Sequence, residues 1–357
     1  MARLTRAQQQ ERTRAAVLAA AREEFAEHGY SDAKVDRIAA RAELTRGAVY
    51  SNFPSKRALY LAVLIDSLEH VGEATSSPAR DEAAAAFARV WLERLPWSGE
   101  TPAGGSLQSR SLDGVLDDEP GRTAMAQVTK LEALLLALCL ESREPRRTRR
   151  VRLAELVLTL LNGAGHLAGT APGFGDPFDV ARACGHLARL DLADTWDPPH
   201  LPFVAPAQRA REPWNPPAEL PDLLTGRPAG FDGDGVIVFL GTGRLDAAEE
   251  AVRAARPGDR ITVAVTTGDP AELGRLVRLR IGDLAGCLRR VFAPDDRPRL
   301  RVVLDDRAAV ATAAAIPETG DATECAVRVE AGSIVARARG RGAAYAVASV
   351  TRSGQAG

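Results

Sequence analysis

A run of prolines divides this chain of 357 residues into two parts with different hydrophobic patterns. Nine prolines fall between residues 196 and 230, in stretches such as WDPPHLPF and EPWNPPAELP. Proline fixes its own φ and cannot donate a backbone hydrogen bond, so residues 196–231 are predicted to be a semi-rigid linker rather than a folded element. A chain of this length is also too long for one typical core, and two or three domains are expected.

The part before the linker, up to about residue 195, has only helical patterns. In the first of them Leu18, Ala21 and Phe25 recur at helical spacing, and Gly29 follows where a glycine typically ends a helix. Alanine- and leucine-rich stretches with Gly or Pro between them predict later helices at residues 79–95, 121–141, 148–167 and 177–192. An all-α fold is therefore expected for this part.

The part after the linker has short apolar runs instead. These runs are VIVFL at 236–240, ITVAV at 261–265 and LRVVL at 300–304, and helical stretches separate them. This alternation is typical of parallel strands joined by crossover helices. Residues 330–333 separate two β-branched runs and indicate an antiparallel hairpin. We therefore predict a small α/β domain at 232–350.

Charge is distributed unevenly although the net charge is only −1. Residues 1–60 hold eleven Arg and Lys against seven Asp and Glu, so this end could face an anionic partner. The chain does not open with a signal peptide pattern and has no clean membrane span, so a cytoplasmic protein without membrane contact is expected.

The cysteines and histidines do not predict a metal or redox centre. Neither CxxC nor another metal-ligand spacing occurs among Cys139, Cys184, Cys287 and Cys325, so they are expected to stay reduced and to pack as small hydrophobic residues. His166 and His186 lack accompanying ligands at suitable spacing. No metal and no cofactor are predicted.

Residues 34–53 have the pattern of two short helices joined by a tight turn. One apolar stripe lies at Val35, Ile38, Ala39 and Ala42. Thr45 is a good N-cap for the second helix, Leu44 and Val49 are placed as a hydrophobic staple, and Pro54 prevents continuation. Ser55 would cap the next helix. This is a helix-turn-helix geometry.

The stretch LTRGAVYSNFPSK, residues 44–56, combines a glycine inside a helix with cations at helix starts. Both choices oppose ordinary helix energetics. They become favourable if a phosphodiester lies at the helix ends, because helix N-termini bind phosphate through free N–H groups. Arg46 and Lys56 fit such a contact, and Gly47 would let the first turn approach DNA closely. Asn52 has the best chemistry for reading a base, since its amide can pair with adenine.

Residues 8–68 resemble the DNA-binding domain of TetR-family transcriptional regulators. The resemblance rests on Phe25 with Gly29-Tyr30, on Ile38-Ala39, on the turn of cap, cation and glycine, and on Tyr50, Phe53, Lys56 and Leu59. It implies that the recognition helix carries Thr45, Arg46, Gly47, Ala48, Tyr50, Ser51 and Asn52, with Tyr50 and Lys56 at phosphates. Glu43 replaces the usual turn glycine. Lys34 stands where Thr or Ser commonly caps, and could add a phosphate contact.

The same resemblance assigns roles to the other helices. Residues 1–70 would be the DNA-binding domain, and residues 71–195 would form a ligand-binding and dimerisation body. The helices at 148–167 and 177–192 would pair with their copies, through a stripe of Leu153, Leu156, Val157, Leu160 and Leu161. A pocket for a small molecule is expected among Phe87, Trp91, Trp97, Met125 and Leu135, although such residues also suit a helical core.

Residues 232–350 are similar to a thioredoxin-like or redoxin fold that lacks its chemistry. Where CxxC would follow the first strand, the chain has Gly241-Thr242-Gly243-Arg244. Without thiolates there is no nucleophile for disulfide exchange. Three alternatives stay open for this region: a redox or transfer enzyme, a redox switch through Cys287 and Cys325, and nucleotide binding through Gly241-Thr242-Gly243.

The sequence therefore predicts a multidomain, non-enzymatic regulator. It would be a homodimeric repressor that binds a palindromic double-stranded DNA operator and is released by a small-molecule effector.

Overall fold

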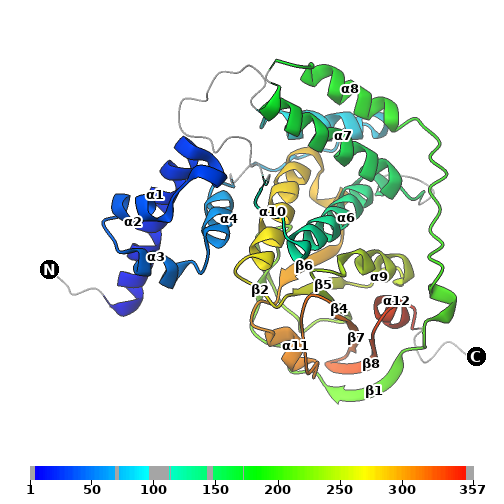
Figure 1. Cartoon of the computed structure of the whole chain (residues 1–357). Coiled ribbons are helices and arrows are strands. Elements are labelled where there is room, and N and C mark those ends of the chain that lie inside the picture. The colour runs from blue at the N-terminus through cyan, green and yellow to red at the C-terminus, as the bar shows by residue number, and fades with distance from the viewer. Residues whose placement is uncertain are drawn as a thin grey trace, which may run out of the picture.

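The computed structural model describes residues 5–68, 72–95, 112, 114–142, 148–171 and 173–350. Up to residue 200 its regular elements are all helical, as Figure 1 shows. They are α1 (Arg6–Asp32), α2 (Val35–Arg41), α3 (Arg46–Asn52), α4 (Lys56–Asp66), η1 (Arg80–Glu82), α5 (Ala83–Leu92), α6 (Glu119–Glu141), α7 (Val151–Thr170) and α8 (Pro177–Leu187). The helices expected from periodicity are thus confirmed, with shifted ends. Gly29 leaves helical geometry at φ 67°, so it interrupts α1 where a terminating glycine was predicted.

The rest of the described chain is an α/β part around a six-stranded sheet of order β1-β8-β7-β4-β5-β6. The strands are β1 (Gln208–Pro213), β4 (Gly235–Gly241), β5 (Ile261–Thr266), β6 (Leu300–Leu304), β7 (Glu324–Glu330) and β8 (Ser333–Arg339), with a separate ribbon of β2 (Leu220–Pro221) and β3 (Pro228–Ala229). The helices are η3 (Leu201–Phe203), η4 (Leu245–Ala247), α9 (Ala248–Ala254), α10 (Leu273–Val291), η5 (Pro294–Asp296), α11 (Ala309–Ala313) and α12 (Ala343–Ala348).

The strand directions agree with the sequence pattern. β4, β5 and β6 are parallel neighbours, and β7 and β8 form the antiparallel hairpin expected at residues 330–333. Its turn residues Ala331 and Gly332 have φ values of 48° and 71°, the left-handed geometry that tight hairpin turns require. An α/β fold with a mixed sheet is confirmed. The thioredoxin-like assignment stays a prediction.

The prediction that residues 196–231 form a semi-rigid linker rather than a folded element is wrong for much of that segment. β1 pairs with β8 and forms one edge of the sheet, and Asp222 forms a bridge with Val303 of β6. Trp214 and Phe231 are buried, and the Trp214 indole N–H donates to the Phe231 carbonyl oxygen at 2.6 Å. Proline is tolerated here because an edge strand leaves some N–H groups unpaired. The prolines therefore mark the rim of the sheet as well as a connection.

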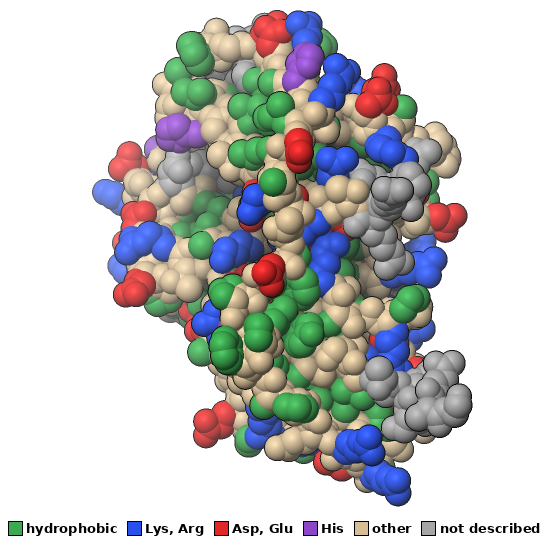
Figure 2. Space-filling view, turned by 90° about the vertical axis from the view of Figure 1, so that its right-hand side faces the viewer, with side chains coloured by type: hydrophobic (Ala, Val, Ile, Leu, Met, Phe, Trp, Pro, Cys, Tyr) green, Lys and Arg blue, Asp and Glu red, His purple; other side chains and the backbone are tan. Residues whose placement is uncertain are grey.

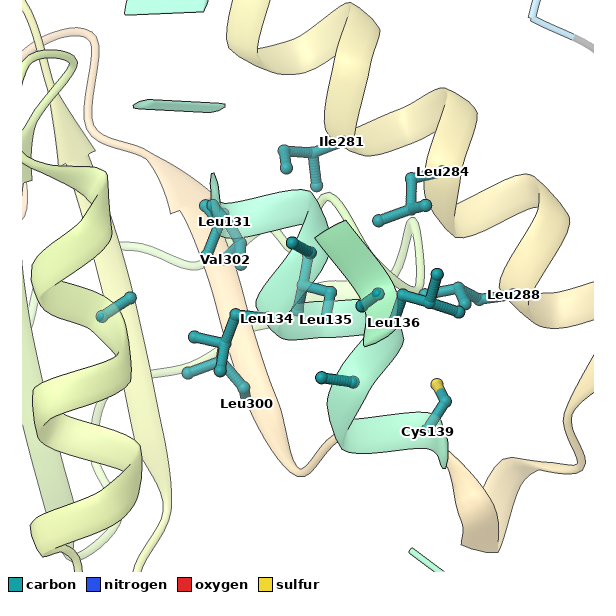
Figure 3. Packing of buried hydrophobic residues seen from close by; sticks show 14 of the residues in the cluster. Leu131, Leu134, Leu135, Leu136, Cys139, Ile281, Leu284, Leu288, Leu300 and Val302 are labelled. Carbon is teal, nitrogen blue, oxygen red and sulfur yellow. The ribbon is translucent and has the colours of Figure 1, made fainter. Parts of the chain in front are cut away.

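The two faces of the sheet pack against different parts of the chain. Side chains alternate along a strand, so Val236, Val238 and Leu240 of β4 face one side and Ile237 and Phe239 the other. The first side joins the cluster of the helical body, as Figure 3 shows, where Leu131, Leu134 and Leu135 of α6 meet strand β6 and helix α10. The second side is covered by α11 and by the segment that carries Trp214 and Phe231. The helical body and the sheet therefore share one hydrophobic core, and the domain boundaries at 70, 195 and 231 stay predictions.

Helix α6 lies at the centre of this core. By length and composition it is the one described helix that could cross a membrane. Its leucines instead contact α10 and β6, and its neighbours in the structure are α7 and α10. Its apolar character is accounted for by this packing, since a helix enclosed by other elements needs apolar residues all around.

Candidate nucleic-acid interface

The helix-turn-helix predicted at residues 34–53 is present. Thr45 caps α3, its hydroxyl oxygen accepting from the Ala48 N–H at 3.2 Å, and Ser55 caps α4 by accepting from the Ala58 N–H at 2.9 Å. Glu43 adopts φ 54° in the turn between α2 and α3. It thus takes the left-handed conformation for which a glycine is more usual, at some conformational cost. Val49 and Phe53 are buried under the turn, as their spacing predicts.

Glu24 of α1 fixes the start of α2. Lys34 has no side-chain cap bond of its own, but its backbone N–H donates to the fully buried Glu24 carboxylate at 2.9 Å. Arg37 Nε donates to the same oxygen at 2.6 Å. Burial opposes ionisation of Glu24, yet the hydrogen bonds from Lys34 and Arg37 prevail and lower its pKa. A carboxylate from another helix thus replaces the missing cap.

Replacing Glu24 with Gln should destabilise the protein by about 2 kcal/mol, because it weakens two hydrogen bonds to a charged acceptor. A carboxyl whose pKa is lowered by folding stabilises the protein fully above its unfolded pKa, and this contribution disappears as the pH falls through the lower folded value. The wild type should therefore lose more stability than Glu24→Gln between pH 5 and acid. Thermal unfolding across this range measures it, with the exposed Glu23→Gln as the matched control. Equal acid sensitivity of wild type and Glu24→Gln would contradict this role.

Glu24, Glu27 and His28 lie close enough to share a metal ion. Arg37 pairs with Glu24, and Arg41 pairs with Glu27. The two arginines already supply positive charge to these carboxylates, so the group is a salt-bridge cluster between α1 and α2. His166 and His186, weighed as ligands, are exposed on α7 and α8.

The first turn of α3 presents the features expected of a DNA-contacting surface. Arg46 and Gly47 of this turn are exposed, as are Tyr50 and Ser51 one turn later. A Cβ added to Gly47 would find only the Thr45 hydroxyl at 3.9 Å, so nothing inside the protein requires glycine. Arg46 lies 3.2 Å from Asp36 and 5.5 Å from the Tyr50 ring centre, in an exposed pair that holds it weakly. Its guanidinium is thus free to exchange Asp36 for a phosphate.

Asn52, Ala48 and Lys56 are placed differently from the four exposed residues. The Asn52 side-chain amide donates to the Ala48 carbonyl oxygen at 2.9 Å, so this half-buried group would have to turn away from its own helix to read a base. Lys56 Nζ donates to the Ser31 carbonyl oxygen at 3.0 Å and lies 4.8 Å from the Tyr30 ring centre. Desolvation lowers its pKa. Lys56 thus has a structural role, and its phosphate contact stays a prediction.

Lys34 is exposed at the N-cap of α2, where the helix-turn-helix unit begins. Of the other predicted contacts, Thr45 is the N-cap of α3 and Lys56 is the first residue of α4, whereas the remaining ones lie on α3. Their direct contacts with DNA remain predictions.

Helix α10 of the α/β part packs against the head, the unit formed by helices α1 to α4, a contact that the sequence did not reveal. The Glu272 carboxylate accepts from the Ser55 hydroxyl and from Arg57, and Arg57 also pairs with Asp118 at 2.6 Å. Arg275 donates to the Ala58 carbonyl oxygen at 2.9 Å. Leu273, Leu276 and Leu279 belong to the same buried cluster as the core of the head. The α/β part is therefore packed directly on α4.

The residues predicted to line an effector pocket lie in or beside the core of the helical body. Phe87 and Leu135 are fully buried there, and Met125 and Trp91 are half-buried against it. Trp91 fills space that a glycine leaves, since a Cβ on Gly165 would lie 3.1 Å from its ring. Trp97 lies outside the described residues. This placement suits packing, and a ligand role for these residues stays untested.

The Gly241-Thr242-Gly243 loop does not provide a phosphate cradle. The three backbone N–H groups donate to the carbonyl oxygens of Thr323, Thr266 and Asp321 at 2.8, 3.1 and 2.8 Å. A Cβ on Gly241 would lie 2.3 Å from the Asp321 carbonyl oxygen. The glycines are thus explained by close approach of the 320–323 backbone, and the nucleotide-binding alternative loses the donors it needs.

The disulfide switch between Cys287 and Cys325 also lacks support. Cys287 is buried with α10 on the face of the sheet that meets α6, whereas Cys325 packs with the cluster on the opposite face. All four cysteines are free thiols. Because a disulfide needs Cα atoms within about 7 Å and suitably directed side chains, the sheet between these two would have to rearrange.

Comparisons with known proteins agree with the helix-turn-helix. Residues 17–63 match the family model described as bacterial regulatory proteins, tetR family. The HTH-type transcriptional regulator SrpR of Pseudomonas putida is 45% identical over 78 residues, which cover 22% of this chain and 36% of that protein. The uncharacterized HTH-type transcriptional regulator TtgW, also of Pseudomonas putida, is 44% identical over 78 residues, 22% of this chain and 57% of that protein. The chain thus spans between a third and three fifths of these relatives.

Solved structures give weaker similarity. NalD of Pseudomonas aeruginosa, the secondary repressor of the MexAB-OprM multidrug efflux pump, is 22% identical with a TM-score of 0.34, over 50% of this chain and 96% of that chain. A TetR-family regulator from Streptomyces coelicolor is 22% identical with a TM-score of 0.23, over 50% of this chain and 93% of its own. Scores this low carry no argument about the fold.

Proposed function

We propose that this chain is a transcriptional repressor that binds a palindromic operator as a homodimer and is released from it by a small molecule. The proposal starts from the match of residues 17–63 to the tetR family model. The observation that carries the proposal is the first turn of α3. Thr45 caps this turn, which is exposed to solvent. Gly47 adds no side chain to its surface, and Arg46 provides a cation that only an exposed ion pair holds. Such a surface suits close contact between a helix and the DNA backbone.

The exposed apolar residues of α7 and α8 support the homodimer. Of the predicted stripe, Leu153, Val157 and Leu161 are buried inside the helical body, so they serve the core of one chain. Leu156 and Leu167 of α7 and Phe178 of α8 are instead exposed, Phe178 by 72%. An apolar surface of this kind typically marks an interaction site. A second copy would cover it and would place two recognition helices for a palindrome.

The contact between α10 and the head offers a route for release. α10 touches α4 of the head as well as α5 and α6 of the body. A ligand that binds more tightly to one arrangement of the body than to the other would shift the position of α10, and with it the position of α4. We also propose that the α/β part is a thioredoxin-like scaffold without thiol chemistry, which is supported by the parallel pair β4–β5 followed by the β7–β8 hairpin.

Replacing Arg46 with Ala should weaken operator binding and make it less dependent on salt. Removing one phosphate contact lowers the slope of log K against log salt by about one, so two heads should lower it by about two. Fluorescence anisotropy with DNA flanking the gene, at several salt concentrations, measures the slope. Arg22→Ala, which removes another exposed arginine of the same domain that pairs with Asp66, is the control. An unchanged slope in Arg46→Ala would remove Arg46 from the interface.

A further inference from the structure

A cavity of about 380 Å³ lies between the helical body and the α/β part. Residues between 195 and 200, in the segment that leaves α8, line one side of the cavity. This closing segment runs down the side of the molecule past α7 and α9 toward β1, as Figure 1 shows. The side chains that the argument uses are Lys130 of α6, Arg149 before α7, Trp196 and His200 of the closing segment, and Asp246 and Glu250 of the α/β part. On this side of the molecule acidic and basic side chains are mixed, as Figure 2 shows.

Glu250 has an oxygen without a partner in this cavity. The residue is only 7% exposed. Its Oε1 lies 2.9 Å from His200 Nε2, whereas its Oε2 is buried and has no hydrogen-bond partner among the described residues. Asp246, in the wall of the same cavity, also has an oxygen without a hydrogen bond, Oδ1, but Arg244 lies 3.8 Å from it as an ion-pair partner. Buried acceptors are normally satisfied, so the Glu250 oxygen indicates that a donor is missing.

The charges of the lining indicate what kind of donor is missing. Five acidic and three basic side chains line the cavity, together with His200. Arg149 is already held by both oxygens of Glu249, at 2.7 and 2.8 Å, and by Asp194. Lys130 lies 3.5 Å from Asp246. Arg152 donates to the carbonyl oxygens of Leu192 and Ala193. Since these cations are engaged, Glu250 Oε2 is left without a donor, and an anionic ligand would be repelled by the acidic lining.

We propose that this cavity binds a small organic cation that carries N–H donors, such as an arylalkylammonium ion, and that this cation is the effector of the proposed repressor. Its ammonium group would donate to Glu250 Oε2, and the half-buried Trp196 ring would contact its apolar part. Burial and the charge of Glu324 raise the pKa of Glu250. A cation beside this carboxylate would favour its charged form and lower the pKa again. The role as effector rests on the proposed function, whereas binding itself does not.

The site also has a physical connection to the head. Lys130 and Leu134 of α6 line the cavity, and Glu132 of the same helix pairs at 2.6 Å with Arg280 of α10. α10 in turn holds α4 through Glu272 and Arg275. A ligand that moves α6 would therefore act on an element that contacts the head.

Isothermal titration calorimetry on the full chain without DNA tests the cavity. The probes are 2-phenylethylammonium, its neutral analogue 2-phenylethanol and the anion 3-phenylpropionate. We expect the cation to bind at least tenfold more tightly than the neutral analogue, and Glu250→Gln to lose this preference. Glu318→Gln, the same change at an exposed residue of the α/β part, should bind as the wild type does. Trp196→Leu should weaken cation binding about tenfold without removing its preference over the alcohol.

The outcomes separate the site from its role. Absence of saturable binding of the cation, tighter binding of the anion, or full cation preference in a folded Glu250→Gln variant would overturn the site. If Glu250→Gln does not fold, cation binding that Trp196→Leu leaves unchanged would overturn it. Operator binding is then measured with and without the cation. Cation binding that leaves operator affinity unchanged would overturn the role as effector. A protein that binds the cation but never binds DNA would overturn the proposed function and leave the cation site standing.

Discussion

Replacing Glu132 with Ala should lower the free energy of unfolding by about 3–5 kcal/mol, because it leaves Arg280 as an unpaired charge in a buried position. Glu132 is 3% exposed in the middle of α6, and Arg280 Nη2 lies 2.6 Å from its carboxylate. A second pair joins Asp283 of the same helix α10 to Arg94, which follows α5, at 2.6 Å. Guanidinium unfolding followed by circular dichroism measures the loss.

The double variant Glu132→Leu with Arg280→Leu is the control. Replacing a buried pair by apolar residues of similar size is often nearly neutral, so the double variant should be much more stable than Glu132→Ala. Because the helical body and the sheet share one core, we also expect both to unfold in a single transition. A loss below about 1 kcal/mol in Glu132→Ala, or separate transitions for helices and sheet, would contradict this description of the core.

Replacing Gly47 with Ala should have opposite effects on folding and on DNA binding. Inside the protein the added methyl group meets only the Thr45 hydroxyl, at the ordinary contact distance of 3.9 Å, so the helix should gain up to about 1 kcal/mol of stability. In the complex the methyl group would lie between α3 and the DNA backbone. A loss of about 1.4 kcal/mol at each head corresponds to tenfold, so a dimer should lose about a hundredfold in affinity.

The control for this variant is Gly286→Ala in α10. A Cβ there also meets open space, but the residue is far along the chain from the helix-turn-helix. Melting temperature and anisotropy titration of the two variants give both quantities. If Gly47→Ala bound operator DNA as tightly as Gly286→Ala, close approach of the DNA to this turn would be contradicted.

Local features of the chain could be predicted because they depend on neighbouring residues. The Thr45 and Ser55 caps, the interruption at Gly29 and the hairpin at residues 330–333 each follow from a few adjacent side chains. The three parallel strands were visible as short apolar runs. These elements are thus determined by interactions between residues that are close in the sequence.

Contacts between distant segments were not accessible in the same way. Glu272 binds Ser55 across 217 residues, and β1 pairs with β8 although the proline-rich composition predicted a semi-rigid linker there. Composition indicates only a local conformational preference of the backbone. The position of the segment that contains β1 is set by the edge of β8, which would otherwise be left unpaired. The cavity around Glu250 was missed for the same reason. Its walls come from α6, from α7, from the segment that follows α8, and from α9, which are far apart in the sequence.

Individual side chains in the interface show a similar limit. Asn52 and Lys56 have the chemistry for DNA contacts, but each already has a partner within the head. Arg46 and Gly47 were predicted to contact DNA as well, and both remain accessible in the structure. Sequence spacing placed all four on the correct helices, and only packing distinguishes them.

DNase I footprinting on the DNA that flanks the gene tests the central claim most directly. We expect one protected region that contains two half-sites whose centres lie about 10 bp apart, or a multiple of that distance, and protection that weakens as salt rises and is lost in Gly47→Ala. Absence of any salt-sensitive protection, or a footprint that Gly47→Ala and Arg46→Ala leave unchanged, would contradict DNA recognition by α3.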